Sequence, residues 1–74
     1  MDEKNFLETL AADILCTDDE LTMETELLSL PEWDSTSAIS FISFVGVHRP
    51  DRVVTHEELK SAKLVRDLYE IVEG

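Results

Sequence analysis

Apolar residues recur at helical spacing in three separate stretches of the chain, over about residues 6–14, 38–45 and 64–72. In each stretch the large side chains fall three or four positions apart, which places them along one side of a helix. They are Phe6, Leu7, Leu10 and Ile14 in the first stretch, Ala38, Ile39, Phe41, Ile42 and Val45 in the second, and Leu64, Val65, Leu68, Ile71 and Val72 in the third. A chain with three such amphipathic segments is predicted to be all-α.

Polar capping residues set the expected limits of the first two helices. Asp2 precedes the first helix, which is expected to run to about Cys16. Asp34 precedes the second, which is expected over residues 35–47. On this second helix the side opposite the apolar stripe holds three serines, Ser37, Ser40 and Ser43.

A short helix is expected before the last long one. Thr55 and Glu58 match a capping box, in which the threonine oxygen accepts from the Glu58 N–H and the glutamate side chain reaches back. This helix should end near Ser61 and cover Val53, Val54 and Leu59. With a final helix over residues 64–73, the prediction is one domain over residues 1–74. Its fold would be a small four-helix bundle of three longer helices and one short helix.

The connection over residues 17–34 follows no helical or strand period. Eighteen residues are many for a connection in so small a domain, and such segments are usually functional or held by their own side chains. The candidate anchors are apolar: Leu21, Leu27, Leu28, Leu30 and Trp33. Trp33 is expected to pack over the entrance to the second helix.

Charge is distributed unevenly along the 74 residues, which carry a net charge of −11. Residues 1–34 hold 11 of the 17 acids but only one of the 6 bases, so nearly all the excess charge precedes residue 35. This acidity disfavours nucleic acid and anionic membranes as partners and favours basic protein surfaces. A domain of this size buries only roughly 60% of its unfolded surface, so a deep enzyme pocket is not expected.

The single cysteine, Cys16, has no partner for an internal disulfide and points away from the apolar stripe, so a surface thiol is expected. There is no N-terminal apolar segment and no run of about 20 apolar residues, which favours a soluble cytoplasmic protein. His56 is expected to be a solvated surface residue, because no metal-ligand spacing accompanies it. No metal site is predicted.

Ser35 stands at the start of the second predicted helix, where backbone N–H groups lack partners and the helix dipole is positive. A phosphate attached to Ser35 would be stabilised there. A catalytic serine needs an oriented base and an oxyanion hole, and the only histidines, His48 and His56, lie in a basic connecting region. The chain is therefore not expected to be an enzyme. On spacing alone, Asp34 and Ser35 are more simply explained as a helix cap.

The run Trp33-Asp34-Ser35-Thr36, with a long acidic loop before it and a small apolar C-terminal helix, resembles the acyl carrier proteins. In that family the serine of an Asp-Ser-Leu motif carries a 4'-phosphopantetheine arm, and the matching residue is Ser35, flanked by Asp34 and Thr36. The resemblance implies a phosphopantetheinyl transferase that uses coenzyme A and Mg²⁺, and acyl groups held as thioesters on the arm. Thr36 stands where the family has leucine, a residue that normally contacts the transferase, which implies a narrower range of transferases.

Fatty-acid carriers present acids along the helix after the serine, but no acid lies between Ser35 and Pro50. The positions expected to face acyl-transferring or acyl-activating enzymes are Ser40, Ser43, Phe44 and Val47. Phe44 is expected either at this surface or beneath the neighbouring loop. The resemblance thus implies a monomeric carrier for a specialised lipid or secondary-metabolite pathway. The alternatives are an aminoacyl or peptidyl carrier, and an unmodified acidic interaction module in which Ser35 is only a helix cap.

Overall fold

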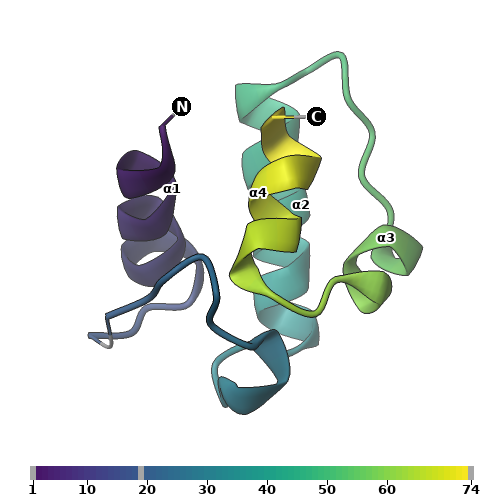
Figure 1. The fold of residues 1–74 in the computed structure, drawn as a ribbon. Coiled ribbons are helices and arrows are strands. Elements are labelled where there is room, and N and C mark those ends of the chain that lie inside the picture. Colours follow the sequence, from purple (N-terminus) through teal and green to yellow (C-terminus); the bar gives the residue numbers. More distant parts are fainter. Residues whose placement is uncertain (1, 19, 74) are drawn as a thin grey trace.

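The computed structural model describes residues 2–18 and 20–73, and it confirms the prediction of a small all-α bundle. Of the described residues, 62% are helical and none forms a strand. The α-helices are α1 (Glu3–Thr9), α2 (Ser35–His48), α3 (His56–Ser61) and α4 (Val65–Glu73). A π-helical turn, η1 (Leu10–Ile14), prolongs α1, and a 3₁₀ turn, η2 (Leu27–Ser29), lies in the long connection. In Figure 1, α4 is drawn across α2, and α3 lies at the edge of the view, where it contacts α2.

The first helix begins and ends close to its predicted limits. The Asp2 carboxylate accepts from the Asn5 N–H at 2.8 Å, as expected for a cap. Phe6 and Leu10 are fully buried, and the helical path continues through η1 to Ile14. Cys16 then turns the chain with a φ of 52°, in the left-handed region that usually follows a helix end. Its thiol is exposed, which confirms the predicted surface cysteine.

Phe41 on α2 is the centre of the core. Its ring, which is fully buried, packs against those of Phe6, Trp33 and Phe44 with centroids 6.4, 6.3 and 6.2 Å apart. Trp33, which is partly buried, thus packs against α2 at Phe41, nearly two turns after the helix start. The other fully buried large side chains are Phe6, Leu10, Leu27, Leu68, Val45, Val65 and Val72.

Two residues of α2 lie on the side opposite to the predicted one. Ile39, expected in the buried stripe, is 55% exposed, and Ser37, expected at the surface, is 4% exposed. The apolar stripe is narrower than predicted, because only Ala38, Phe41 and Val45 among its predicted members are buried. Ser37 is drawn inward by the hydrogen bonds of the helix start, described below.

The long connection is held to the start of α4 by its backbone. The N–H of Leu27 donates to the Lys63 carbonyl at 2.8 Å, and the N–H of Val65 donates to the Thr25 carbonyl at 2.9 Å. Three predicted anchors, Leu21, Leu27 and Leu30, are buried. The prediction for Leu28 was wrong, since this residue is 92% exposed. Residues three apart lie on the same side of a 3₁₀ turn, so Leu27 and Leu30 both point inward. Leu28, between them, points outward.

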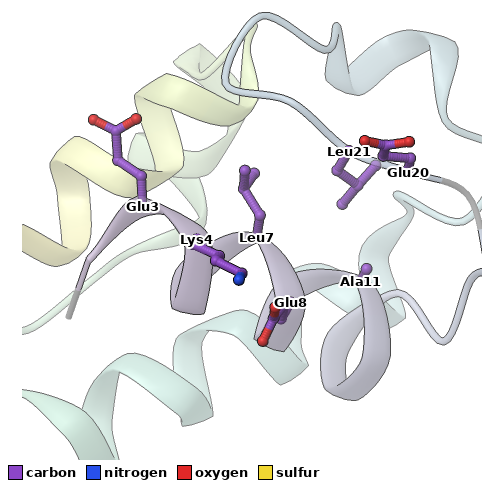
Figure 2. Close-up of a pocket in the computed structure, with 7 residues that line it drawn as sticks. All are labelled: Glu3, Lys4, Leu7, Glu8, Ala11, Glu20 and Leu21. Carbon is purple, nitrogen blue, oxygen red and sulfur yellow. The ribbon is translucent and has the colours of Figure 1, made fainter.

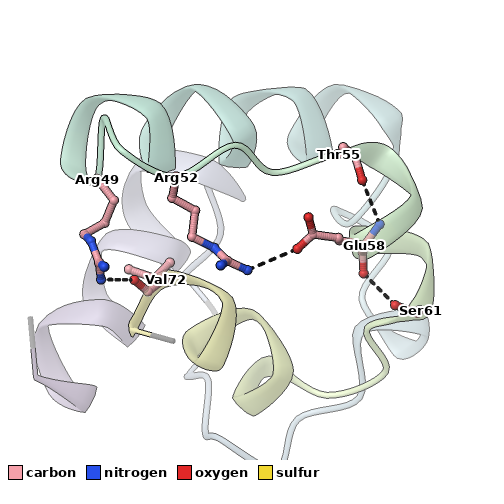
Figure 3. A network of polar contacts seen from close by, with 6 residues as sticks. All are labelled: Arg49, Arg52, Thr55, Glu58, Ser61 and Val72. Atoms are coloured by element: carbon pink, nitrogen blue, oxygen red, sulfur yellow. Dashed lines mark hydrogen bonds and ion pairs between the residues drawn. The ribbon is translucent and has the colours of Figure 1, made fainter.

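Two arginines of the loop before α3 bond to later helices, Arg52 to α3 and Arg49 to α4 (Figure 3). Thr55 Oγ1 accepts from the Glu58 N–H at 3.3 Å, but the Glu58 carboxylate pairs with Arg52 at 3.2 Å. The predicted reciprocal bond of the capping box is thus replaced by an ion pair. The Arg49 guanidinium donates to the Val72 carbonyl at 2.7 Å and so satisfies a carbonyl in the last turn of α4.

Of the three apolar residues predicted to pack beneath α3, two are buried and one is not. Val54 and Leu59 are buried, whereas Val53 is 81% exposed. Val53 and Val54 are neighbours in a non-helical segment, where successive side chains point to opposite sides, so only one of them faces the core. The prediction for Val53 was therefore wrong.

Candidate functional site

The start of α2 is closed by a reciprocal cap between Asp34 and Ser37. The Asp34 N–H donates to Ser37 Oγ at 2.9 Å, and the Ser37 N–H donates to Asp34 Oδ1 at 3.1 Å. The Ser37 hydroxyl in turn donates to the Glu32 carbonyl at 2.5 Å. The bond from the Ser37 N–H holds the pKa of the Asp34 carboxyl below its usual value. The carboxylate is therefore charged at neutral pH and stabilises the positive end of the helix.

Ser35 is the first residue of α2 and is exposed. Its hydroxyl takes no part in the cap, which consists of Asp34 and Ser37. Within residues 2–18 and 20–73 no hydrogen bond engages this hydroxyl. The neighbouring Thr36 is also exposed. The structure thus separates two serines of one helix turn: Ser37 is a buried structural residue, and Ser35 presents a free hydroxyl to the solvent.

A surface pocket of about 330 Å³ adjoins Ser35. It lies between the start of α2, the 3₁₀ turn η2 and α3. Its lining residues are Leu28, Trp33, Asp34, Ser35, Ala38, His56, Leu59, Lys60 and Ala62. The pocket therefore combines apolar walls with two basic side chains beside an exposed hydroxyl.

His56 and Lys60 were not predicted to lie near the serine. They are four residues apart on α3, so one face of this short helix carries both. Their i, i+4 spacing is visible in the sequence, but it does not say which helix they face. His56 is exposed as expected, and the structure adds that it lines the same pocket as Ser35.

The predicted partner residues lie along α2 in one stripe with Thr36. Thr36, Ser40, Ser43 and Val47 follow each other at intervals of four, three and four residues, and all four are exposed. Phe44 is half-buried: it packs against Phe41 and stacks on His48 with centroids 5.6 Å apart. Phe44 is thus a partly covered residue beside the stripe, and the exposed Ile39, one turn after Ser35, is an apolar surface residue that the sequence pattern missed.

Among the described residues, no group of three or more His, Cys, Asp or Glu side chains is placed to hold a metal ion. None of the described helices is both long enough and apolar enough to cross a membrane. Comparisons with protein-family models, with curated proteins and with solved structures gave no significant match. A function for this chain must therefore be argued from the site itself.

Proposed function

We propose that this chain is an acyl carrier protein, which holds acyl groups as thioesters on a 4'-phosphopantetheine arm attached to Ser35. The observation that carries the proposal is the exposed Ser35 hydroxyl, which the helix cap leaves unused at the start of a 14-residue helix. A carrier serine needs access for a transferring enzyme and no acid–base machinery of its own, because the attached cofactor and the partner enzymes supply the chemistry.

The surroundings of Ser35 fit a phosphodiester. The first N–H groups of α2 have no carbonyl partners within the helix, and the helix dipole places positive potential there. His56 and Lys60 line the same pocket and add N–H donors on the side of α3, where Lys60 also adds a positive charge. Leu28, Ala38 and Leu59 offer apolar contacts to the first part of an arm that alternates amide and alkyl groups. The pantetheine thiol, when bound, supplies the thioester chemistry.

The exposed stripe of Thr36, Ser40, Ser43 and Val47 is the proposed docking face for partner enzymes. It begins one residue after Ser35 and contains no charge, so it suits a neutral, partly apolar partner surface. The acids of residues 1–34 then attract basic enzymes over longer distances. Such a face supports a specialised lipid or secondary-metabolite pathway rather than the acid-lined helix of fatty-acid carriers.

The test is incubation of the protein with coenzyme A, Mg²⁺ and a broad-specificity phosphopantetheinyl transferase, followed by intact mass measurement. The expected result is a gain of one phosphopantetheine, which is lost in Ser35→Ala. Ser61→Ala is the matched control, because it removes an exposed serine that lies outside the proposed docking face, and it should still be modified. Absence of any gain with several transferases would favour an unmodified interaction module. Mass spectrometry of the acid that is loaded separates an acyl carrier from an aminoacyl or peptidyl carrier.

A further inference from the structure

A second surface groove lies between α1 and the long connection, and its volume is about 570 Å³. Figure 2 shows its lining residues along the first helical segment, from Glu3 to Ala11, and on a neighbouring loop segment at Glu20 and Leu21. Its apolar residues are Leu7, Ala11 and Leu21, and its charged residues are Glu3, Lys4, Glu8 and Glu20. Leu7 and Ala11 are only half-buried, although both pack against the core, so their outer surfaces remain open to the solvent.

We propose that this groove binds a basic, amphipathic helical segment of a partner protein. Leu7, Ala11 and Leu21 would contact the apolar face of that segment. Glu3, Glu8 and Glu20, which are all exposed, would meet its lysine or arginine side chains. The groove follows α1 and the start of η1 from Glu3 to Ala11, a rise of about 12 Å, which corresponds to roughly two turns of a bound helix.

The negative charge of the groove favours a basic protein segment over a second copy of the chain, a lipid or a nucleic acid. A second copy of the chain would bring another net charge of −11 to a groove that is already acidic. Anionic lipid and nucleic acid would be repelled for the same reason. Lys4 is the only base that lines the groove, and three acids that line it outnumber it. A basic protein segment is therefore the macromolecule whose charge complements the groove.

The groove is separate from the Ser35 pocket. The two have no lining residue in common, and α2 and α3 contribute nothing to the groove. A partner bound in the groove would therefore leave the Ser35 hydroxyl accessible. The inference does not depend on modification of Ser35, and it is tested on protein that has not been incubated with a transferase.

The experiment titrates the ¹⁵N-labelled full chain with a synthetic, end-capped helical peptide of about 12 residues. Leucines form one face of this peptide and lysines the other, and a matched peptide of the same charge replaces each leucine by serine. The expected result is amide shift changes centred on Leu7, Ala11 and Leu21, with an affinity about tenfold above that of the serine peptide. Equal affinities, or shift changes spread over the acids outside the groove, would overturn the proposal.

Two exposed glutamates provide a matched pair of variants that each lower the negative charge by one. Glu8→Gln removes an acid of the groove, and Glu57→Gln removes an acid of α3 that lies outside it. Glu8→Gln should weaken peptide binding about threefold, whereas Glu57→Gln should change it little. Lys4→Glu should strengthen binding by a similar factor. Equal weakening by both glutamine variants would show non-specific charge attraction and would refute the proposal. Binding of phosphatidylcholine vesicles through the same residues would assign the groove to lipid and would also refute it.

Discussion

Asp34 and Ser37 cap the same helix reciprocally, each backbone N–H donating to the side chain of the other at 2.9 and 3.1 Å. Ser35 lies between them and is not part of this arrangement. Ser35 and Ser37, two positions apart in the sequence, thus have different roles. Ser37 fixes the direction in which α2 begins, and that direction exposes Ser35.

Replacement of these two serines should separate stability from modification. Ser37→Ala removes the acceptor of the Asp34 N–H and a buried hydroxyl, so the free energy of unfolding should fall by about 1–2 kcal/mol. Ser35→Ala should change it by less than about 0.5 kcal/mol, because the residue is exposed. Urea unfolding followed by Trp33 fluorescence measures both values. Equal losses in the two variants would contradict the assignment of the cap.

The start of α4 should make stability depend on pH through Asp67. Its carboxylate accepts from the N–H groups of Leu64 at 3.0 Å and Lys63 at 2.8 Å, and these bonds lower the pKa of the carboxyl. A lowered pKa in the folded state means that the stabilisation is present above the usual pKa of aspartate and is lost as the pH falls through the lower, folded value.

Asp67→Asn keeps an oxygen acceptor but removes the charge, so it isolates this effect. The wild type should be more stable than Asp67→Asn at pH 7, and the difference should shrink as the pH is lowered below about 4. Thermal unfolding at a series of pH values measures the difference. Protonation of the other acids also changes stability at low pH, but the wild type and the variant share those acids, so this change drops out of the difference. A difference that stays constant down to pH 2.5 would rule out the proposed role of the Asp67 carboxylate.

The aromatic core should depend strongly on Phe41, which contacts three other aromatic rings. Phe41→Ala should cost about 3–5 kcal/mol, a large part of the stability of a domain of this size. Phe41→Leu keeps most of the volume and should cost about 1.5 kcal/mol. Val47→Ala, at an exposed position of the same helix, serves as the control and should cost less than about 0.5 kcal/mol. Chemical denaturation ranks the three variants, and a loss in Val47→Ala as large as that in Phe41→Leu would refute the assignment of the core.

Position 36 should influence the rate of modification without affecting the fold. Thr36→Leu introduces the residue that stands after the serine in acyl carrier proteins, at an exposed position in the first turn of α2. The leucine should add apolar contact with a broad-specificity transferase. A gain of about 1 kcal/mol from this contact should raise kcat/KM for phosphopantetheine transfer about fivefold. Thr36→Ser serves as a control that shortens the side chain. An unchanged rate in Thr36→Leu would show that this position does not contact the transferase.

The helices could be predicted from the sequence because each is specified locally. The caps at Asp2 and Asp34, the spacing of Phe6 and Leu10 on the first helix and that of Phe41 and Val45 on the second each involve residues within a few turns of each other. Leu28 and Val53 were assigned wrongly because they lie in irregular segments, where hydrophobicity alone does not determine the side of the chain on which a residue lies. Ile39 shows that a broad apolar stripe overestimates the part of a helix that is covered.

The candidate site was predicted only in part, for a similar reason. Ser35 could be singled out because the signals for its helix start are adjacent to it in sequence. His56 and Lys60 meet Ser35 through the packing of α3 near the start of α2, which depends on the path of residues 49–55. No local pattern encodes that path. Arg52 likewise makes a contact between two segments: its ion pair with Glu58 links the loop before α3 to α3 itself.

The long connection reaches α4 through main-chain bonds, from Leu27 to Lys63 and from Val65 to Thr25. Any residue other than proline can donate such bonds, so amino acid identity along much of this stretch is under weak constraint. Related chains are therefore expected to diverge more at the exposed Glu26 and Leu28 than at Thr22 and Thr25, whose hydroxyls accept backbone N–H bonds, while their backbones trace the same course. Evolution can thus alter the charge and shape of this surface without disturbing the fold that supports Ser35.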